Sequence, residues 1–266
     1  MNTVHLKHLA QTTTRRCRIV IPVLAALIIT CTVAYGHEDI AVLRTVDDQL
    51  LTGVADHDHG DVEAPIRVYE GAFGDLFFSN DPGFVAPEHE DHLPPGHALL
   101  PPDTDLGFSL KAFTLPGAAT NLAYWNGIGS VDFAPVTADY SLDAYWGPMH
   151  AIANGSGEDI PGFIFAGTDS EGGIHEHLNF QLSRDGGTVA EGIYAWALDL
   201  NMPGMQDSEP FFILHETSMA PLPPTLDLAV DWVNTNYDAL TVPEPSSLVM
   251  LSSMALGTLL WYRRRR

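Results

Sequence analysis

The stretch GGIHEHLNFQL, residues 172–182, alternates apolar and polar side chains in the way that a β-strand requires. Successive side chains of a strand point to opposite faces of the sheet. One face would carry Ile174, Glu176, Leu178, Phe180 and Leu182, and the other His175, His177, Asn179 and Gln181. The polar row is either a solvated sheet face or the floor of a binding site.

The rest of the chain has the same short-strand character. Residues 190–200 alternate as clearly as the first stretch, helical periodicity is scarce, and Gly, Pro, Asn and Asp separate the apolar segments. We therefore expect an all-β domain, an antiparallel β-sandwich or jelly roll, with a surface loop at the Pro-rich residues 87–102. The expected strands are 39–46, 49–53, 66–69, 105–113, 130–134, 142–144, 162–167, 174–182, 192–199 and 211–217.

Residues 1–36 have the layout of a secretory signal peptide. Basic residues from Lys7 to Arg18 precede an apolar run at 19–30 and the small-residue pattern that ends at Gly36. Cleavage after Gly36 would make His37 the first residue of an exported domain, residues 37–220. Twin-arginine export at Arg15-Arg16 and a lipoprotein cleavage box at Cys31 are weaker alternatives.

The other end has three parts: the triplet Pro243-Glu244-Pro245, an apolar tract at about 246–262, and arginines at 263–266. As a helix the tract reaches about 25 Å, at the short limit for a bilayer core, and the arginines favour the cytoplasmic side. Residues 243–266 resemble the PEP-CTERM sorting signal of bacterial exosortase systems. That resemblance implies an exosortase-type sorting enzyme as partner, transient membrane anchoring through the C-terminal helix, and delivery to the cell envelope, surface or extracellular matrix. An ordinary anchor is the alternative, and residues 221–242 are expected to be a linker, with a short helix at 226–234.

The body between residues 37 and 242 is strongly acidic. Of the 34 acidic residues only Glu244 lies outside it, whereas its basic residues are only Arg44, Arg67, Lys111 and Arg184, which gives a net charge of −29. Nucleic acid and anionic membrane surfaces are therefore poor partners, and metal cations are better ones. Acidity that serves only solubility is the alternative.

Both cysteines, Cys17 and Cys31, fall in the signal peptide. The exported domain thus lacks disulfides and thiolate ligands, and its length suffices for one hydrophobic core. A transition metal would have to be bound by imidazole and carboxylate, a donor set that suits zinc first, then copper or nickel.

Ten of the twelve histidines lie in this body, and most are clustered beside acidic residues. His175 and His177, two residues apart on one strand face, can tilt onto one ion. The other groups are His37 with Asp39, His57 with His59, the loop residues His89, His92 and His97, and the single residues His150 and His215. Taken singly, His150 and His215 fit structural roles, and the HxH pair alone fits a polar sheet face.

Several of these motifs occur together in a known family. His175-Glu176-His177-Leu178-Asn179-Phe180 followed by Gly192-Ile193-Tyr194 resembles the HxHxN…GxY segment of bacterial surface-anchored domains found beside zinc- and manganese-type ABC transporters, and of related PEP-CTERM proteins repressed by the zinc uptake regulator. The segments 36–40, 126–129 and 145–150 resemble the opening GHxDI, the glycine-rich middle and the GPGH of that family, although Met149 replaces a glycine.

The resemblance implies a zinc-binding protein, exported when zinc is scarce, that captures the ion or hands it over, with a zinc/manganese ABC transporter system as a possible partner. The implied ligands are His175 and His177, with His37, His57, His59 and His150 as candidates and Asp39 as a carboxylate ligand or a partner that orients an imidazole.

Three other functions stay open. A cupin-like metal-dependent enzyme also uses HxH, but Gln181 and Leu182 stand where cupins place Glu, so a non-enzymatic role is preferred. A calcium- or carbohydrate-binding matrix protein would use acidic loops such as residues 167–171, because calcium takes oxygen ligands. Copper could bind His37 through its α-amine and imidazole if the mature chain begins there.

Overall fold

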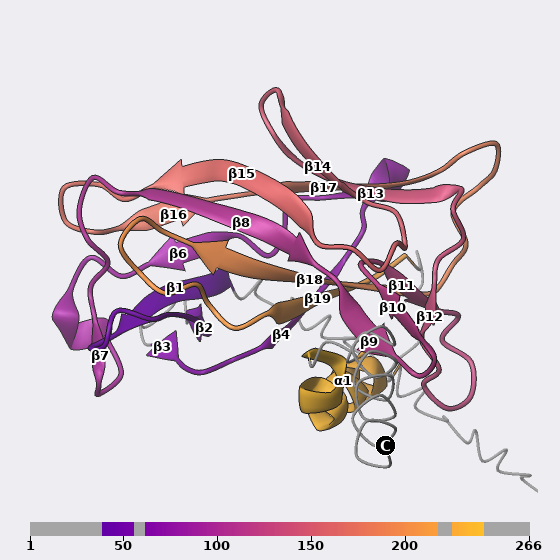
Figure 1. Ribbon diagram of the computed structural model, residues 1–266, viewed down its shortest axis with the longest axis horizontal. Coiled ribbons are helices and arrows are strands. Elements are labelled where there is room, and N and C mark those ends of the chain that lie inside the picture. The colour runs from indigo at the N-terminus through magenta and orange to yellow at the C-terminus, as the bar shows by residue number, and fades with distance from the viewer. Residues whose placement is uncertain (1–38, 56–61, 218–224, 242–266) are drawn as a thin grey trace, which may run out of the picture. The chain divides into compact units, whose positions relative to one another are not determined.

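A computed structural model describes residues 39–55, 62–217 and 225–241. Strands dominate these residues and one α-helix accompanies them, so the all-β expectation is confirmed (Figure 1). The expected signal peptide, residues 56–61 with His57 and His59, and the expected sorting signal with its apolar tract at 246–262 lie outside the described residues. Among the described helices, none is long and apolar enough to cross a membrane.

Three sheets and one small hairpin make up the domain. The N-terminal sheet has the order β16-β6-β1-β2-β3, and β7 also pairs with β1. The central sheet has the order β12-β11-β18-β19-β4, and β8 pairs with both β18 and β15. The outer sheet has the order β14-β13-β17-β5. The N-terminal sheet comprises β1 (Asp39–Thr45), β2 (Leu50–Ala55), β3 (Val62–Glu63), β6 (Phe84–Ala86), β7 (His97–Ala98) and β16 (Ile174–Glu176). The central sheet comprises β4 (Val68–Ala72), β8 (Asp105–Lys111), β11 (Ala123–Trp125), β12 (Ala134–Pro135), β15 (Ile160–Gly167), β18 (Ile193–Asn201) and β19 (Phe211–Glu216). The outer sheet comprises β5 (Phe78–Ser79), β13 (Tyr140–Trp146), β14 (Met149–Ala153) and β17 (Asn179–Arg184), and the hairpin β9 (Phe113–Leu115) and β10 (Ala118–Thr120).

Strand β18 explains why two cores form. Its side chains are buried from Ile193 to Leu200, and they alternate between two hydrophobic clusters. Tyr194, Trp196 and Leu198 face a core that all three sheets share, whereas Ile193, Ala195 and Ala197 face a second core. A strand covered on both faces reads as an almost continuous apolar run, which is the sequence of this strand.

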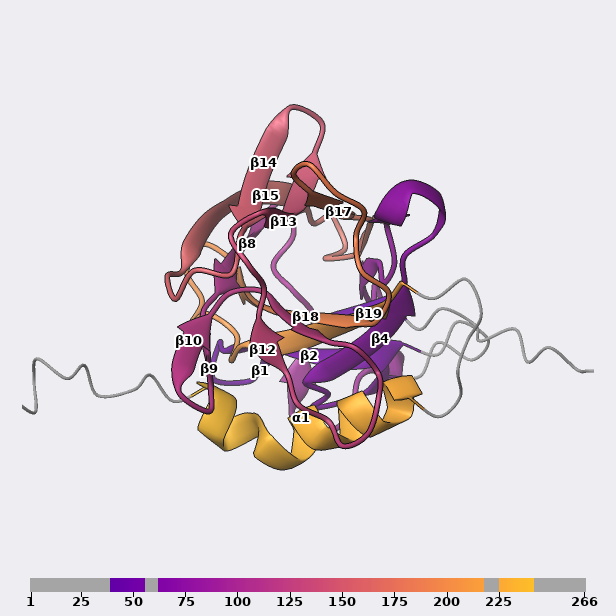
Figure 2. The same ribbon diagram turned by 90° about the vertical axis from the view of Figure 1, so that its right-hand side faces the viewer.

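Helix α1 (Thr225–Thr241) covers the second core, on the face of the central sheet opposite the outer sheet (Figure 2). Its buried residues Ala229, Val233, Tyr237 and Leu240 recur at helical spacing, so one stripe of the helix faces β4, β9 and β19. The Tyr237 hydroxyl donates a hydrogen bond to the carbonyl of Pro210. The helix is therefore longer than the expected 226–234 and is packed into the domain.

The structure departs from the expected strands in several places, and the expected surface loop at residues 87–102 contains the short strand β7, which pairs with β1. Residues 174–182 form two strands in different sheets, β16 and β17, because the chain leaves the N-terminal sheet at His177 and Leu178. Only residue 134 of the expected strand 130–134 is in a strand. Two pairings are parallel, β1 with β6 and β4 with β19, so the sheets are not purely antiparallel.

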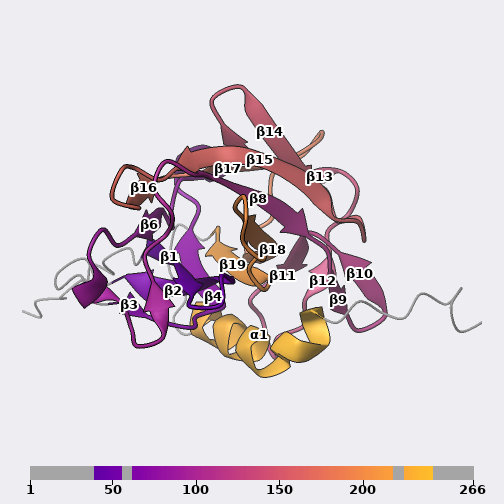
Figure 3. The ribbon, with the colours of Figure 1, turned by 60° about the vertical axis from the view of Figure 1, so that its left-hand side comes forward.

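Two chain segments cross between the same two sheets side by side, and this positions the candidate site. Residues 80–83 run from β5 of the outer sheet to β6 of the N-terminal sheet, and residues 177–178 run from β16 to β17 in the reverse sense. Strand β1 lies next to β6 in the N-terminal sheet (Figure 3). The crossing therefore brings residues 39, 80–83 and 175–177 together.

Candidate metal centre

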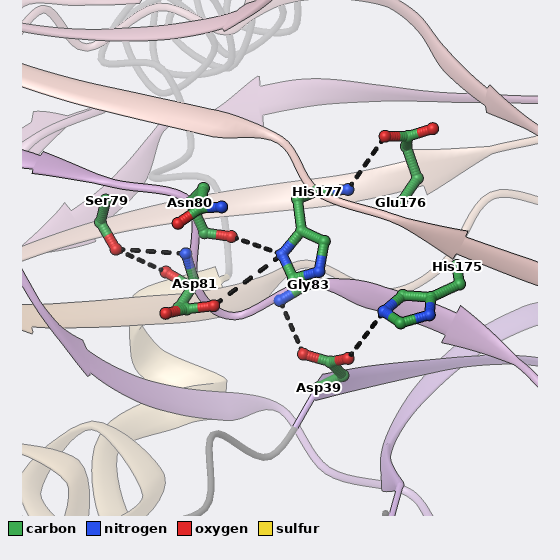
Figure 4. Close-up of polar contacts among 8 residues, drawn as sticks. All are labelled: Asp39, Ser79, Asn80, Asp81, Gly83, His175, Glu176 and His177. Atoms are coloured by element: carbon green, nitrogen blue, oxygen red, sulfur yellow. Dashed lines mark hydrogen bonds and ion pairs between the residues drawn. The ribbon is translucent and has the colours of Figure 1, made fainter.

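Asp39, His175 and His177 form a cluster that can hold a metal ion. One ligand atom from each of the three lies within 4.8 Å of the other two (Figure 4). Asp39 is the first residue of β1, His175 is the middle residue of β16, and His177 follows that strand directly. Three of the residues predicted from the sequence thus form a cluster that could hold a metal ion.

Sheet register explains why these residues meet. Strand β6 lies between β1 and β16, with Phe84 paired to both Ile40 and Glu176. One residue further along the row, Gly83 lies between Asp39 and His177. An added Cβ on Gly83 would lie 2.9 Å from Asp39 Oδ1 and 2.7 Å from His177 Cε1, so the absence of a side chain at this position keeps the space between the two ligands open.

The Asp39 carboxylate is fixed before any ion binds. Its side chain is only 4% exposed, and Oδ1 accepts a hydrogen bond from the backbone N–H of Gly83 at 3.0 Å. The other oxygen, Oδ2, lies 3.7 Å from Nε2 of His175. A hydrogen bond of this kind orients a carboxylate ligand, and here it directs Oδ2 toward the histidines.

His177 is held in one tautomer by the crossing segment. Its Nδ1 lies 2.8 Å from the carbonyl oxygen of Asn80, and because a carbonyl can only accept, Nδ1 carries the proton. Nε2 of the neutral ring is then unprotonated and available to a metal. The Asp81 carboxylate lies 3.8 Å from the same Nδ1 and favours this orientation.

The segment that supports His177 is itself tied down. The Ser79 hydroxyl donates to the carbonyl of Asp81 and accepts from its backbone N–H, and the carbonyl of Gly83 accepts from the N–H of Ile40. Neither Asn80 nor Gly83 was predicted from the sequence to belong to a site. The only local signal for them is the turn-forming tripeptide Asp81-Pro82-Gly83, which indicates a turn and not a site.

The three ligand atoms would fit a small, borderline-soft cation once they move slightly closer together. Ligand atoms that share one tetrahedral ion with bonds of about 2.1 Å lie roughly 3.4 Å apart, so the three atoms must approach one another. His175 can supply this movement, because its side chain is 63% exposed whereas that of His177 is 35% exposed. Two imidazoles and one carboxylate exclude a purely oxygen-ligated calcium site and leave at least one coordination position for a further ligand.

Of the other predicted ligands, only His150 lies among the described residues, and it is not part of this cluster. His37, His57 and His59 lie outside the described residues. His150 lies on β14, where Nδ1 is 2.9 Å from Oδ2 of Asp143 and the ring stacks on Tyr145. Within the part of the chain that the structure describes, the cluster of Asp39, His175 and His177 does not include it.

His215 occupies a different environment, in the shared core. It is fully buried on β19 and its ring packs against Phe73 and Trp196 with centroid distances of 4.8 and 4.9 Å. Neither ring nitrogen makes a hydrogen bond of good geometry among the described residues. Burial lowers the pKa of His215 to about 3, and the nearby backbone of Asp81 offsets only part of that shift.

Comparison of the chain with family models, with curated proteins and with solved structures finds no match.

Proposed function

We propose that this protein is an exported, surface-sorted zinc-binding protein that captures zinc and hands it over when zinc is limiting. The observation that carries the proposal is the convergence of Asp39, from β1, with His175 and His177, which lie in a distant part of the sequence. The orienting hydrogen bonds from Gly83 to Asp39 and from His177 to Asn80 support it, because ligands of metal sites are typically held in this way.

The choice of zinc rests on the donor set and on the resemblance. Imidazole with carboxylate and without thiolate suits zinc, copper or nickel, and the HxHxN-type resemblance favours zinc among these. Export and surface delivery rest on the features of residues 1–36 and 243–266, and a transporter or another surface protein would receive the ion. His37 and the pair His57 and His59 remain candidates for a fourth ligand. In the sequence, His57 follows Ala55 by two residues, and Ala55 is the residue of β2 that pairs with Asp39.

Calorimetric titration with zinc tests the proposal. We expect one tight zinc site in the purified protein and its loss in the double variant His175→Ala/His177→Ala. The double variant His92→Ala/His97→Ala is the matched control, because it also removes two histidines but leaves the cluster intact. Unchanged zinc stoichiometry in the first variant would refute the proposal. Sequencing the N-terminus of the exported protein tests cleavage after Gly36, and a first residue other than His37 would exclude copper binding through the α-amine.

A metal-dependent enzyme is the second candidate. The observation that favours it is the open coordination position, since catalytic metal sites typically have three protein ligands and leave a position for water or substrate. Hydrolysis of an activated ester by the zinc-loaded protein, abolished by His175→Ala/His177→Ala, would support an enzyme. Absence of this activity together with transfer of zinc to a competing chelator would favour the binding protein.

A further inference from the structure

Lys111, Asp159 and Asp199 form a cluster of charged side chains on the central sheet, and none of them belongs to the candidate metal centre. Lys111 is the last residue of β8, Asp159 directly precedes β15, and Asp199 lies on β18. The Lys111 ammonium donates a hydrogen bond to Oδ2 of Asp159, and its Nζ lies 3.5 Å from Oδ2 of Asp199. An amine is therefore held between two carboxyl groups.

The strand register holds the three side chains together. Strand β8 lies between β15 and β18 in the central sheet (Figure 1). Lys111 pairs with Ala197, two residues before Asp199, so Lys111 and Asp199 are diagonal neighbours on one face, within reach of a long side chain. The backbone N–H of Ala112 donates a hydrogen bond to Oδ1 of Asp159 at 2.8 Å, which fixes this carboxylate beside the amine.

The two carboxyl groups have different environments. The Asp199 side chain is 12% exposed, and its buried Oδ1 makes no hydrogen bond of good geometry among the described residues, whereas the Asp159 side chain is 52% exposed. Burial raises the pKa of Asp199, and the charge of Lys111 offsets only part of this shift. The neutral acid form of Asp199 is therefore more accessible than that of an exposed aspartate. A neutral carboxylic acid reacts with an amine, whereas a carboxylate does not.

Lys111 needs a base before it can react. Burial lowers its pKa, but Asp159 and Asp199 raise it overall, so the side chain is an ammonium ion. Asp159 accepts a hydrogen bond from this ammonium and can take its proton, and its exposure lets it pass protons to water. The cluster thus contains a nucleophile, a general base and an acid that the nucleophile can attack.

We propose that Lys111 and Asp199 condense to an isopeptide bond that joins β8 to β18. Asp159 takes one proton from the Lys111 ammonium, and the amine nitrogen attacks Cγ of the neutral Asp199 side chain. The bond from Cγ to the hydroxyl breaks as the proton on Asp159 moves to that oxygen, and water leaves. The second proton lost by the nitrogen passes through Asp159 to solvent. An ammonium and a carboxylic acid thereby give an amide, one water molecule and one proton, and the reaction consumes no oxidant or cofactor.

The bond would stabilise a body that has no cysteine. Both cysteines precede residue 37, so no disulfide can limit the conformations of the unfolded chain between residues 37 and 242. A covalent link between residues 111 and 199 would do so in the way that a disulfide does. The bond does not involve zinc and is independent of the proposed function.

Tryptic digestion of the purified wild-type protein, unfolded beforehand, tests the bond. Trypsin cleaves after free lysine and arginine, and between residues 45 and 262 these are only Arg67, Lys111 and Arg184. We expect Lys111 to remain uncut and mass spectrometry to find residues 68–184 joined to the peptide that begins at residue 185. The joined mass should be lower than the sum of the two peptide masses by the mass of one water molecule. Separate peptides 68–111 and 112–184 as the main products would overturn the proposal.

Variants identify the reacting groups. Lys111→Arg removes the nucleophile, and Asp159→Asn removes the base but retains both groups that would be joined, so both variants should give unjoined peptides. Asp139→Asn is the matched control, because it removes the carboxylate of the ion pair with Arg184 and should retain the joined peptide. Equal joining in Asp159→Asn and the wild type would contradict the role of Asp159 as the base.

Discussion

The backbone N–H of Gly83 donates a hydrogen bond to the carboxylate of Asp39, and it does so across 44 positions of the sequence. The bond fixes one ligand of the candidate metal centre, while the missing side chain of the same glycine leaves room for another, His177. One residue between two candidate ligands thus supplies both orientation and space.

Replacing Gly83 with alanine should weaken zinc binding by about tenfold to a hundredfold, the range found when groups that support metal ligands are disturbed. The new methyl group would occupy the space between Asp39 Oδ1 and the His177 ring, so one of them must move. Zinc titration of Gly83→Ala against Gly74→Ala checks this, because a Cβ on Gly74 meets only an ordinary contact at 3.5 Å. Equal zinc affinities in the two variants would contradict the role assigned to Gly83.

Two substitutions of Asp39 should distinguish the effect of its negative charge on zinc affinity from the effect of its hydrogen bond on stability. Asp39→Asn retains an oxygen that accepts the Gly83 N–H, so we expect near-normal stability with zinc affinity reduced by about tenfold or more. Asp39→Ala leaves the buried N–H without its partner and should cost a further 1–3 kcal/mol or so of folding free energy. Urea unfolding and zinc titration of both variants measure the two effects. Equal stability of the two variants would show that the hydrogen bond contributes little.

His215 should make the protein sensitive to acid. In the folded state the pKa of His215 is lowered from 6.5 to about 3. Between these values the unfolded chain binds a proton at this histidine that the folded chain does not. The contribution of the neutral histidine to stability is therefore fully present above pH 6.5 and is lost as the pH falls toward 3. Between pH 7 and pH 4 this group alone should remove roughly 3 kcal/mol of unfolding free energy. His215→Leu should lose that part of the pH dependence.

Urea unfolding of wild type, His215→Leu and the exposed control His92→Leu at pH 7 and pH 4 makes the comparison. Carboxylates titrate in the same interval in all three proteins, so the difference between variants isolates the histidine. If His215→Leu and His92→Leu respond to acid alike, His215 is not the group responsible.

The members of the candidate cluster were predicted from the sequence, whereas the residues around them were not. His175, His177 and Asp39 were named because paired histidines beside acids are the expected transition-metal ligands in a body without cysteine. The alternation in β18 likewise indicated a buried strand. These signals are local, since side-chain periodicity depends only on neighbouring residues.

The crossing of two segments between two sheets could not be predicted from local patterns. Residues 174–182 keep a regular alternation although the strand breaks at His177 and Leu178, because burial still alternates across the break. Gly83 and Asn80 acquire their roles from the pairing of β6 with β1 and β16, which are distant in the sequence. The prolines before residue 225 also favoured a linker, although the stripe from Ala229 to Leu240 packs a full helix on the sheet.

Anomalous diffraction at the zinc absorption edge, from crystals of the zinc-bound protein, would locate the bound ion. We predict a single strong peak bounded by Asp39, His175 and His177, at bonding distance from Nε2 of His177 and from the carboxylate of Asp39. Any fourth ligand, whether His37, His57 or His59, would be visible in the electron-density map from the same crystals. A strong zinc peak elsewhere with no peak between these three residues would contradict it.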